Sequence, residues 1–188
     1  MHLLFSRLLA MPKCTDFCED KIEKALFLDI DGVIHPFTQC RYEYMNDMEQ
    51  LLNELENKFH INYREFDKCD VAMAYYDWDK DSVKEIKRIL DVTGARIVVS
   101  SSWRCGTTGN SLPFLLRIHD LQKYLYGYTP IMQSRPVEIL EYLKMHPHIK
   151  KWVAVDDMNL TTFFPNNAII TYPKITTKDA DKCIEILG

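Results

Sequence analysis

Four short apolar runs most constrain the fold of this chain, because each is typical of a strand and helical patterns separate them. The runs are ALFLDI at residues 25–30, ARIVVS at 95–100, KWVAVDD at 151–157 and NAIITY at 167–172. They are nearly continuous in apolar character rather than alternating, which is typical of strands buried on both faces of a parallel sheet. The sequence therefore predicts a sheet whose two faces are covered by helices.

Helical patterns lie between and after these runs. Apolar residues recur there at spacings of three and four, which is the period of an amphipathic helix. The pattern predicts helices at residues 42–60, 80–92, 112–125, 136–146 and 177–187. Because strands and helices alternate, we expect right-handed crossovers and a doubly wound, three-layer α/β/α fold with a mainly parallel sheet.

Length and composition fit a single domain. The 188 residues are 47% hydrophobic and 27% charged, which is typical of a globular protein and not of a disordered one. We expect one domain over residues 1–188, with a helical extension at 1–24. Residues 35–78 are the least regular and the richest in aromatic side chains, so they predict a small cap-like insertion with one convincing helix.

No segment has the pattern of a membrane span or of a signal peptide. The apolar N-terminal run is interrupted by Arg7 and is far shorter than the roughly 20 residues that cross a bilayer. The six cysteines form no C-x-x-C pair, and with the histidines they give no zinc-finger spacing. These features predict a soluble cytoplasmic protein with reduced thiols, and they leave the oligomeric state open.

Polar side chains follow the apolar runs at the points where the strands end. Asp29 and Asp31 close the first run, Ser100 closes the second, and Asp156 and Asp157 close the third. Ligands of such sheets bind at the carboxyl edge of the strands, where these side chains would meet. Carboxylates that lie so close repel one another unless a cation or a proton lies between them, and Mg²⁺ prefers oxygen ligands. We therefore expect a magnesium site at this edge.

Four motifs, in this order, resemble those of the haloacid dehalogenase (HAD) superfamily. LFLDIDGVIHP is similar to its first motif, D-x-D-G after an apolar strand, and RIVVSSSWR to its second, a strand that ends in Ser or Thr. Arg135 in SRPVEI is similar to the basic residue of the third motif, and WVAVDD to the paired acids of the fourth. The resemblance spans about residues 25–172 and is especially marked for the small HAD domains of RNA-repair proteins.

The resemblance implies roles for single residues of a phosphatase. Asp29 would be the nucleophile that forms an aspartyl-phosphate, and Asp31 would be the general acid and base. The hydroxyl of Ser100 or Ser101 would bind a phosphoryl oxygen, and the triple serine leaves the register open by one residue. Arg135 stands where the superfamily more often has lysine, and it would neutralise charge on the nucleophile and the phosphoryl group.

The resemblance also implies the metal ligands. Mg²⁺ would be bound by Asp29, by the main-chain carbonyl of Asp31 and by the acid pair, with Asp157 favoured over Asp156 as the direct ligand. Arg104 follows the second motif, and it is expected either to bind the phosphate of the substrate or to be a surface residue.

Aromatic residues near the motifs admit two interpretations. Trp103 and the cluster of Tyr75, Tyr76 and Trp78 are suited to stack on a base or on a phosphotyrosine ring, but packing is the commoner role of such residues. His35 could face the pocket, although the His-Pro dipeptide more simply indicates a turn.

Large caps of the HAD superfamily enclose small metabolites, so the resemblance implies that a small cap leaves an open site that reaches phosphates on macromolecules. The formal net charge of -4 and the lack of a basic stripe favour a phosphoprotein, such as one with phosphotyrosine, over a nucleic acid. The RNA-repair resemblance instead favours a polynucleotide 3′-phosphate. Between the two we expect a phosphoprotein, with the polynucleotide as the alternative. A HAD-fold binding module without turnover is an alternative of a different class, although both acid pairs are present. Asp31 argues against a dehalogenase, because dehalogenases of this superfamily lack the second aspartate.

Overall fold

The computed structural model describes residues 21–36 and 47–188. Within these ranges five strands form one sheet in the order β3-β2-β1-β4-β5, and every pair of neighbours is parallel. The strands are β1 Lys24–Leu28, β2 Arg96–Val99, β3 Leu125–Tyr128, β4 Lys151–Asp156 and β5 Ala168–Ile170. The parallel sheet and four of its strands confirm the prediction from the apolar runs.

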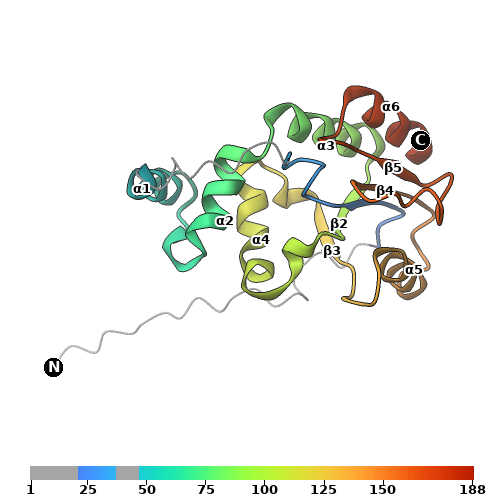
Figure 1. Cartoon of the computed structure of the whole chain (residues 1–188), viewed down its shortest axis with the longest axis horizontal. Coiled ribbons are helices and arrows are strands. Elements are labelled where there is room, and N and C mark those ends of the chain that lie inside the picture. Colours follow the sequence, from blue (N-terminus) through green and yellow to red (C-terminus); the bar gives the residue numbers. More distant parts are fainter. Residues whose placement is uncertain (1–20, 37–46) are drawn as a thin grey trace.

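Helices cover both faces of this sheet. The α-helices are α1 Met48–Phe59, α2 Lys68–Ala72, α3 Lys80–Thr93, α4 Gly106–Ile118, α5 Arg135–Met145 and α6 Thr177–Leu187. Short helical turns are η2 Tyr63–Glu65, η3 Met73–Asp77, η4 Ser102–Arg104 and η5 Gln122–Tyr124. α3 and α6 pack together on one face, and α5 covers the other (Figure 1). These three layers confirm the doubly wound α/β/α fold.

Two hydrophobic cores follow from the alternation of side chains along β1. Leu26 and Leu28 belong to the larger core, which includes side chains of α3, α4 and α6. Ala25 and Phe27 point the other way, into a smaller core that α5 helps to form. All four are fully buried, and burial of a large apolar side chain stabilises a fold by roughly 1.5–3 kcal/mol. By the same alternation, Asp29 emerges from the strand on the face of α5.

Helix ends agree with their sequence signals. The side chain of Asp79 accepts a hydrogen bond from the backbone N–H of Ser82 and so caps α3. Gly94 has a φ of 71°, and it ends the same helix with a bond from its N–H to the carbonyl of Leu90. Pro136 lies in the first turn of α5, where its missing N–H costs no hydrogen bond.

The helix predicted at residues 112–125 is wrong in its second half. α4 ends at Ile118, and Asp120 then adopts a left-handed conformation with a φ of 56°. A helical turn leads from there into β3, an edge strand that the sequence analysis missed. Leu121 and Tyr124 are buried in the same core as α4, so they continue the helical spacing although the backbone has changed.

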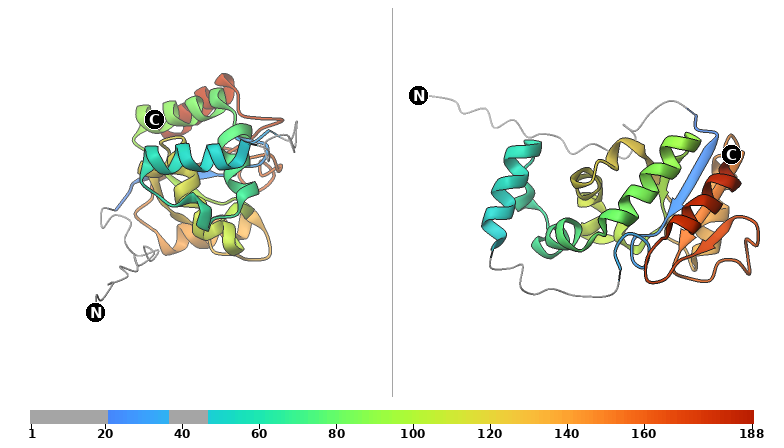
Figure 2. Two further views of the ribbon diagram at one scale, coloured as in Figure 1. Left: turned by 90° about the vertical axis from the view of Figure 1, so that its left-hand side faces the viewer. Right: turned by 90° about the horizontal axis from the view of Figure 1, so that it is seen from above.

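The insertion between β1 and β2 holds more helix than the single helix expected. Its described part contains α1, η2, α2 and η3, and it lies beside α4 at one end of the molecule (Figures 1 and 2). The ring of Phe66 stacks on Phe114 of α4 with the centroids 5.0 Å apart. The hydroxyl of Tyr63 donates a hydrogen bond to the carbonyl of Phe114 at 3.0 Å. The insertion is therefore joined to the main core by buried and partly buried aromatic contacts.

Two predicted elements lie partly outside the described residues. α1 corresponds to the helix predicted at 42–60, whose first residues, 42–46, are outside. The same holds for residues 1–20 of the predicted N-terminal extension. No helix in the described ranges is long and apolar enough to cross a lipid bilayer.

Candidate active site

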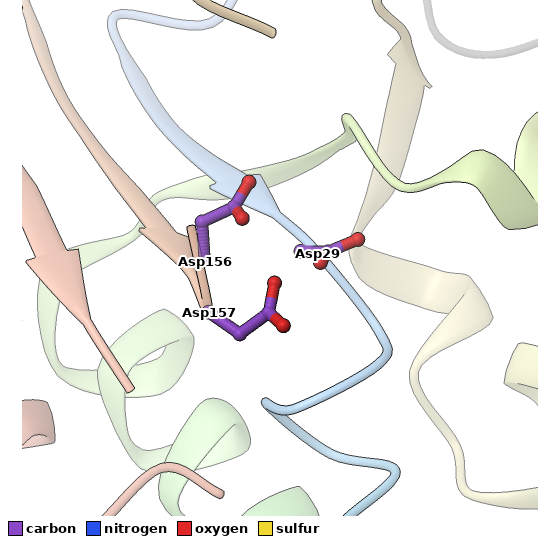
Figure 3. Close-up of side chains that lie close together, drawn as sticks. All are labelled: Asp29, Asp156 and Asp157. Atoms are coloured by element: carbon purple, nitrogen blue, oxygen red, sulfur yellow. The ribbon is translucent and has the colours of Figure 1, made fainter. Parts of the chain in front are cut away.

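Three carboxylates meet at the carboxyl edge of the sheet. Asp29 follows β1, and Asp156 and Asp157 lie at the end of β4 (Figure 3). Each offers an oxygen within 4.8 Å of the oxygens of the other two. The register explains this, because Phe27 pairs with Ala154, so the strands deliver Asp29 and Asp156 side by side two residues further on. The edge-of-sheet rule therefore brings together three of the acids expected to bind a metal.

Arg135 joins two of these carboxylates. Its Nη1 atom lies 2.5 Å from Oδ2 of Asp156 and 3.4 Å from Oδ1 of Asp29. Arg135 is the first residue of α5, the helix that covers this face of the sheet. The side chain is only 12% exposed, so its charge acts in a poorly hydrated environment. This geometry suits the predicted neutralisation of charge at Asp29.

The pKa values of Asp29 and Asp156, the two buried acids of the cluster, are both raised. Burial raises the pKa of Asp29, and the charge of Arg135 and a hydrogen bond from Ser101 oppose that rise. Burial and the negative charge of Asp29 raise the pKa of Asp156 to about 7, despite the opposing charge of Arg135. Both anions therefore need more positive charge than the described side chains supply.

The cluster fits a divalent cation. When the three aspartates are ionised, Arg135 compensates one of their charges and two remain. The donors are carboxylate oxygens alone, which is the donor type that Mg²⁺ and Ca²⁺ prefer. A cation among these oxygens would remove the mutual repulsion that raises the pKa of Asp156.

Asp156 and Asp157 differ in what their carboxylates already contact. Asp156 accepts a hydrogen bond from the backbone N–H of Met158 at 2.9 Å and another from Arg135. Among the described residues, none forms a hydrogen bond or an ion pair with the carboxylate of Asp157, which is half-buried. The free oxygens of Asp157 are consistent with the predicted direct ligand, and the occupied oxygens of Asp156 with a supporting position.

Asp31 lies apart from the three-carboxylate cluster. Oδ1 of Asp31 is 2.7 Å from Nδ1 of His35, and Oδ2 accepts a hydrogen bond from the indole N–H of Trp103 at 2.9 Å. The turn between Asp31 and His35 depends on Gly32, whose φ of 71° favours glycine. The side chains of Asp29 and Asp31 therefore have different neighbours, although the two residues are only two positions apart.

The sequence analysis did not predict that His35 and Trp103 contact the carboxylate of Asp31. His35 was expected mainly to shape a turn, and Trp103 was considered for stacking on a substrate. The Trp103 ring is only 8% exposed and packs edge-on against His35 and Trp78. The sequence did signal that both residues lie near the site, because HP ends the first quoted motif and SSSW lies within the second.

The two candidate serines occupy different environments. Ser101 hydrogen-bonds to Asp29, and its Oγ accepts from the backbone N–H of Trp103. The Ser100 hydroxyl is buried and has no hydrogen-bond partner within the described part of the chain. Ser101 thus contacts the predicted nucleophile directly, whereas Ser100 keeps a free hydroxyl next to it along the sheet edge.

Arg104 contacts the protein itself. Its guanidinium donates hydrogen bonds to the backbone carbonyls of Ser100, Ser101 and Thr129, and it forms an ion pair with Glu138 at 2.6 Å. The Arg104 side chain is 5% exposed. These contacts favour a role in fastening the loops after β2 and β3 over the expected contact with the phosphate of a substrate.

Glu138 is a buried acid that the sequence analysis overlooked. It lies one turn after Arg135 on α5, with 3.6 Å between Oε2 of Glu138 and Nε of Arg135. It also pairs with Arg104 and accepts a hydrogen bond from the backbone N–H of Met132. Glu138 thus holds both arginines in place, and its i,i+3 spacing from Arg135 was the only signal in the sequence.

A cavity of about 290 Å³ opens beside Asp31. Its walls come from the first motif, from the loop and helix after β2, and from α2 and η3 of the insertion. The lining residues are Asp31, His35, Asp70, Met73, Ser102, Trp103 and Thr108. The insertion therefore lines part of this cavity, and its contribution includes the carboxylate of Asp70.

The aromatic cluster of the insertion is mostly used for packing. Trp78 is 2% exposed and stacks on the ring of His119. The hydroxyl of Tyr75 donates a hydrogen bond to Glu54. Trp78 therefore has no open face for a substrate ring.

Comparison with known proteins identifies one family. A scan of protein families matches residues 25–181 to the family described as the HAD domain in Swiss Army Knife RNA repair proteins. The match covers all four motifs and the insertion. Searches of curated proteins and of solved structures found no match.

Proposed function

The chain belongs to the HAD domains of Swiss Army Knife RNA repair proteins, and from that membership and the site geometry we propose that it is a magnesium-dependent phosphatase. The observation that carries the proposal is the convergence of Asp29, Asp156 and Asp157 within 4.8 Å, with Arg135 against two of them. We propose that the substrate is the terminal phosphate of a polynucleotide.

Asp29 is the proposed nucleophile. One of its carboxylate oxygens attacks the phosphorus atom, so that a bond from Asp29 to phosphorus forms while the bond from phosphorus to the leaving oxygen breaks. A hydrolytic water then attacks the aspartyl-phosphate, inorganic phosphate departs and the carboxylate is regenerated. The 3.4 Å contact with Arg135 supports this role, because it offsets the repulsion between the nucleophile and an anionic phosphate.

Asp29, Asp157 and the main-chain carbonyl of Asp31 would hold Mg²⁺, with Asp156 as a supporting acid. When bound, the ion supplies positive charge that lets two anions approach each other. Arg135 orients Asp156 and favours its ionised form, because its guanidinium lies 2.5 Å from that carboxylate. The hydroxyls of Ser100 and Ser101 are the proposed donors to the phosphoryl oxygens.

Asp31 is the proposed general acid. It protonates the leaving oxygen in the first step and removes a proton from the attacking water in the second. The contacts with His35 and Trp103 support this role, because they hold the carboxyl in the lining of the cavity. A fixed proton donor on the leaving-group side matters most when the leaving alcohol is a poor one.

The net charge of the chain and its family favour different substrate classes. The net charge of -4 favours a phosphoprotein, whereas membership of the RNA-repair family favours a nucleic acid end. We give the family more weight, because a single terminal phosphate can be bound without the long basic groove that internal polynucleotide binding needs. A local pocket and a dication suffice for one phosphate.

Phosphate release tests the proposal. The purified chain is incubated with a 3′-phosphorylated RNA oligonucleotide and, separately, with a phosphotyrosine peptide. We expect Mg²⁺-dependent release from the oligonucleotide, loss of release in chelator, and poor support by Ca²⁺ because its larger, looser coordination shell misplaces the reacting oxygens. Asp29→Asn is the control for a contaminating phosphatase.

Other outcomes are equally informative. Release from the peptide alone would replace the substrate class with a phosphoprotein and keep the chemistry. Full activity in chelator would contradict the metal site. A folded protein that binds Mg²⁺ but hydrolyses neither substrate would favour a binding module without turnover.

A further inference from the structure

A cavity lies beside Asp31, the proposed proton donor to the leaving oxygen. If Asp29 attacks the phosphorus atom and Asp31 protonates the leaving oxygen, the rest of the substrate extends past Asp31. The lining of this cavity includes Asp31, the proposed general acid. It also includes His35 and Trp103, which contact the carboxyl of Asp31. Its volume of about 290 Å³ lies near the lower end of the range for small-molecule sites. A single nucleoside suits such a volume better than a longer piece of chain.

The lining of the same cavity includes an acid without a countercharge. Asp70 of α2 is half-buried, and its Oδ2 atom accepts a hydrogen bond from the hydroxyl of Thr108 at 2.8 Å. In the described part of the chain, Asp70 forms no ion pair, and its carboxylate has no hydrogen-bond partner other than Thr108. A carboxylate in this state lacks part of its solvation, so a hydrogen-bond donor on a ligand would be favoured there.

The charge of Asp70 limits what enters the cavity. This carboxylate would repel a second phosphate group, so the next phosphate of a polynucleotide must stay outside. A sugar hydroxyl, in contrast, donates a hydrogen bond and carries no charge. In a ribonucleotide with a 3′-phosphate, the 2′-hydroxyl is on the carbon next to the phosphorylated one, and a deoxyribonucleotide lacks it.

We propose that this cavity binds the terminal nucleoside of the substrate and that Asp70 accepts a hydrogen bond from its 2′-hydroxyl. Asp70 is then a specificity residue that selects RNA over DNA ends. The inference rests on the proposed phosphatase function and adds a contact that is distinct from the reacting groups.

A pair of matched substrates tests the contact. The value of kcat/KM is measured for phosphate release from two 3′-phosphorylated oligonucleotides of one sequence, one ending in a ribonucleotide and one in a deoxyribonucleotide. We expect the wild-type chain to prefer the ribonucleotide roughly tenfold or more, the effect of a hydrogen bond to a charged group. Asp70→Ala should lower the ribonucleotide value to the deoxyribonucleotide value and leave the latter nearly unchanged.

Two further variants serve as controls for this test. Asp81 is an exposed acid in the first turn of α3, so Asp81→Ala removes the same charge away from the cavity and should keep the preference. Asp70→Asn keeps an acceptor oxygen but loses the charge, so it should retain a reduced preference. If Asp70→Ala does not fold, Asp70→Asn decides the question, and an undiminished preference in it overturns the proposal.

The results separate failure of this inference from failure of the proposed function. Equal hydrolysis of both oligonucleotides by the wild-type chain overturns the role of Asp70 and leaves the phosphatase proposal standing. Retention of the full preference in Asp70→Ala does the same. Hydrolysis of a phosphotyrosine peptide and of neither oligonucleotide overturns the proposed substrate class, and with it the nucleoside site.

Discussion

The two sides of the proposed reaction centre are held by different kinds of structure. The phosphate side, around Asp29, is built from the ends of β1 and β4 and from the start of α5. The leaving-group side, around Asp31, is built from a turn, the loop after β2 and the insertion. The first side is fixed by sheet register, and the second by contacts between segments far apart in sequence. Chemistry common to a fold can lie on the first side, whereas substrate choice can vary on the second.

The largest expected effect comes from replacing Asp29, the proposed nucleophile on the phosphate side. We expect Asp29→Asn to lower the rate of phosphate release roughly 10³-fold or more, because the amide cannot form the covalent intermediate. The free energy of unfolding should stay constant or rise, because a neutral group replaces a buried carboxyl whose pKa is raised. Rate assays and thermal denaturation, with Asp81→Asn as the exposed control, check both. A variant with wild-type turnover would contradict the role of Asp29.

Arg135→Lys tests how much the geometry of the phosphate side matters beyond charge. The guanidinium contacts Asp29, Asp156 and Glu138 at once, which a single ammonium group cannot reproduce. We expect kcat to fall by roughly 10- to 100-fold, the cost of about 1.4–2.7 kcal/mol in transition-state stabilisation. Steady-state kinetics measures this. Equal activity of the lysine variant would mean that charge alone is required.

Trp103→Phe tests a single hydrogen bond on the leaving-group side, the one from Trp103 to Asp31. Phenylalanine keeps an aromatic ring between His35 and Trp78 but removes the N–H that donates to Asp31. We expect hydrolysis of alkyl phosphates to slow roughly fivefold to tenfold, because loss of one hydrogen bond to a charged group misplaces the general acid. Aryl phosphates with good leaving groups need little protonation and should be nearly unaffected. Equal slowing of both classes would indicate a structural role instead.

The smallest expected effect concerns the packing of the insertion. Burial lowers the pKa of His119 below its usual 6.5, and the ring stacks on Trp78 and contacts the carbonyl of Ala74. The unfolded chain therefore binds a proton more readily than the folded one. Stability from neutral His119 is complete above a pH of about 6.5 and is lost as the pH falls through the lower, folded pKa.

Urea unfolding at several pH values between about 7.5 and about 5.5 measures this loss. His119→Gln removes the titrating ring, so its unfolding midpoint should depend less on pH over that interval. Identical pH dependence in the variant and the wild-type chain would show that other groups cause it.

The phosphate side could be predicted from the sequence because each of its parts has a local signal. Asp29, Asp156 and Asp157 each end an apolar run, and the rule for parallel sheets then brings them to one edge. Arg135 was found through the resemblance of SRPVEI to the third motif of the superfamily. Pattern and register together were sufficient, since these contacts depend on the order of the strands and not on the packing of irregular segments.

The leaving-group side could not be predicted in the same way. Asp70 and Thr108 lie 38 residues apart on two helices, and no periodicity in the sequence relates them. Trp103 was recognised as an aromatic residue near the site, but its N–H contact with Asp31 depends on the turn of η4. β3 was missed for a related reason, because Tyr124 keeps the helical spacing while it packs in the same core.

Trapping of the phosphoryl-enzyme is the decisive test of Asp29 as the nucleophile. The chain is mixed with a 3′-phosphorylated oligonucleotide and Mg²⁺, quenched with acid within one turnover, digested and examined by mass spectrometry. The account predicts one added phosphoryl group on the peptide that contains Asp29, absent in Asp29→Asn and in chelator. Turnover without that adduct, or with the adduct on another residue, would contradict it.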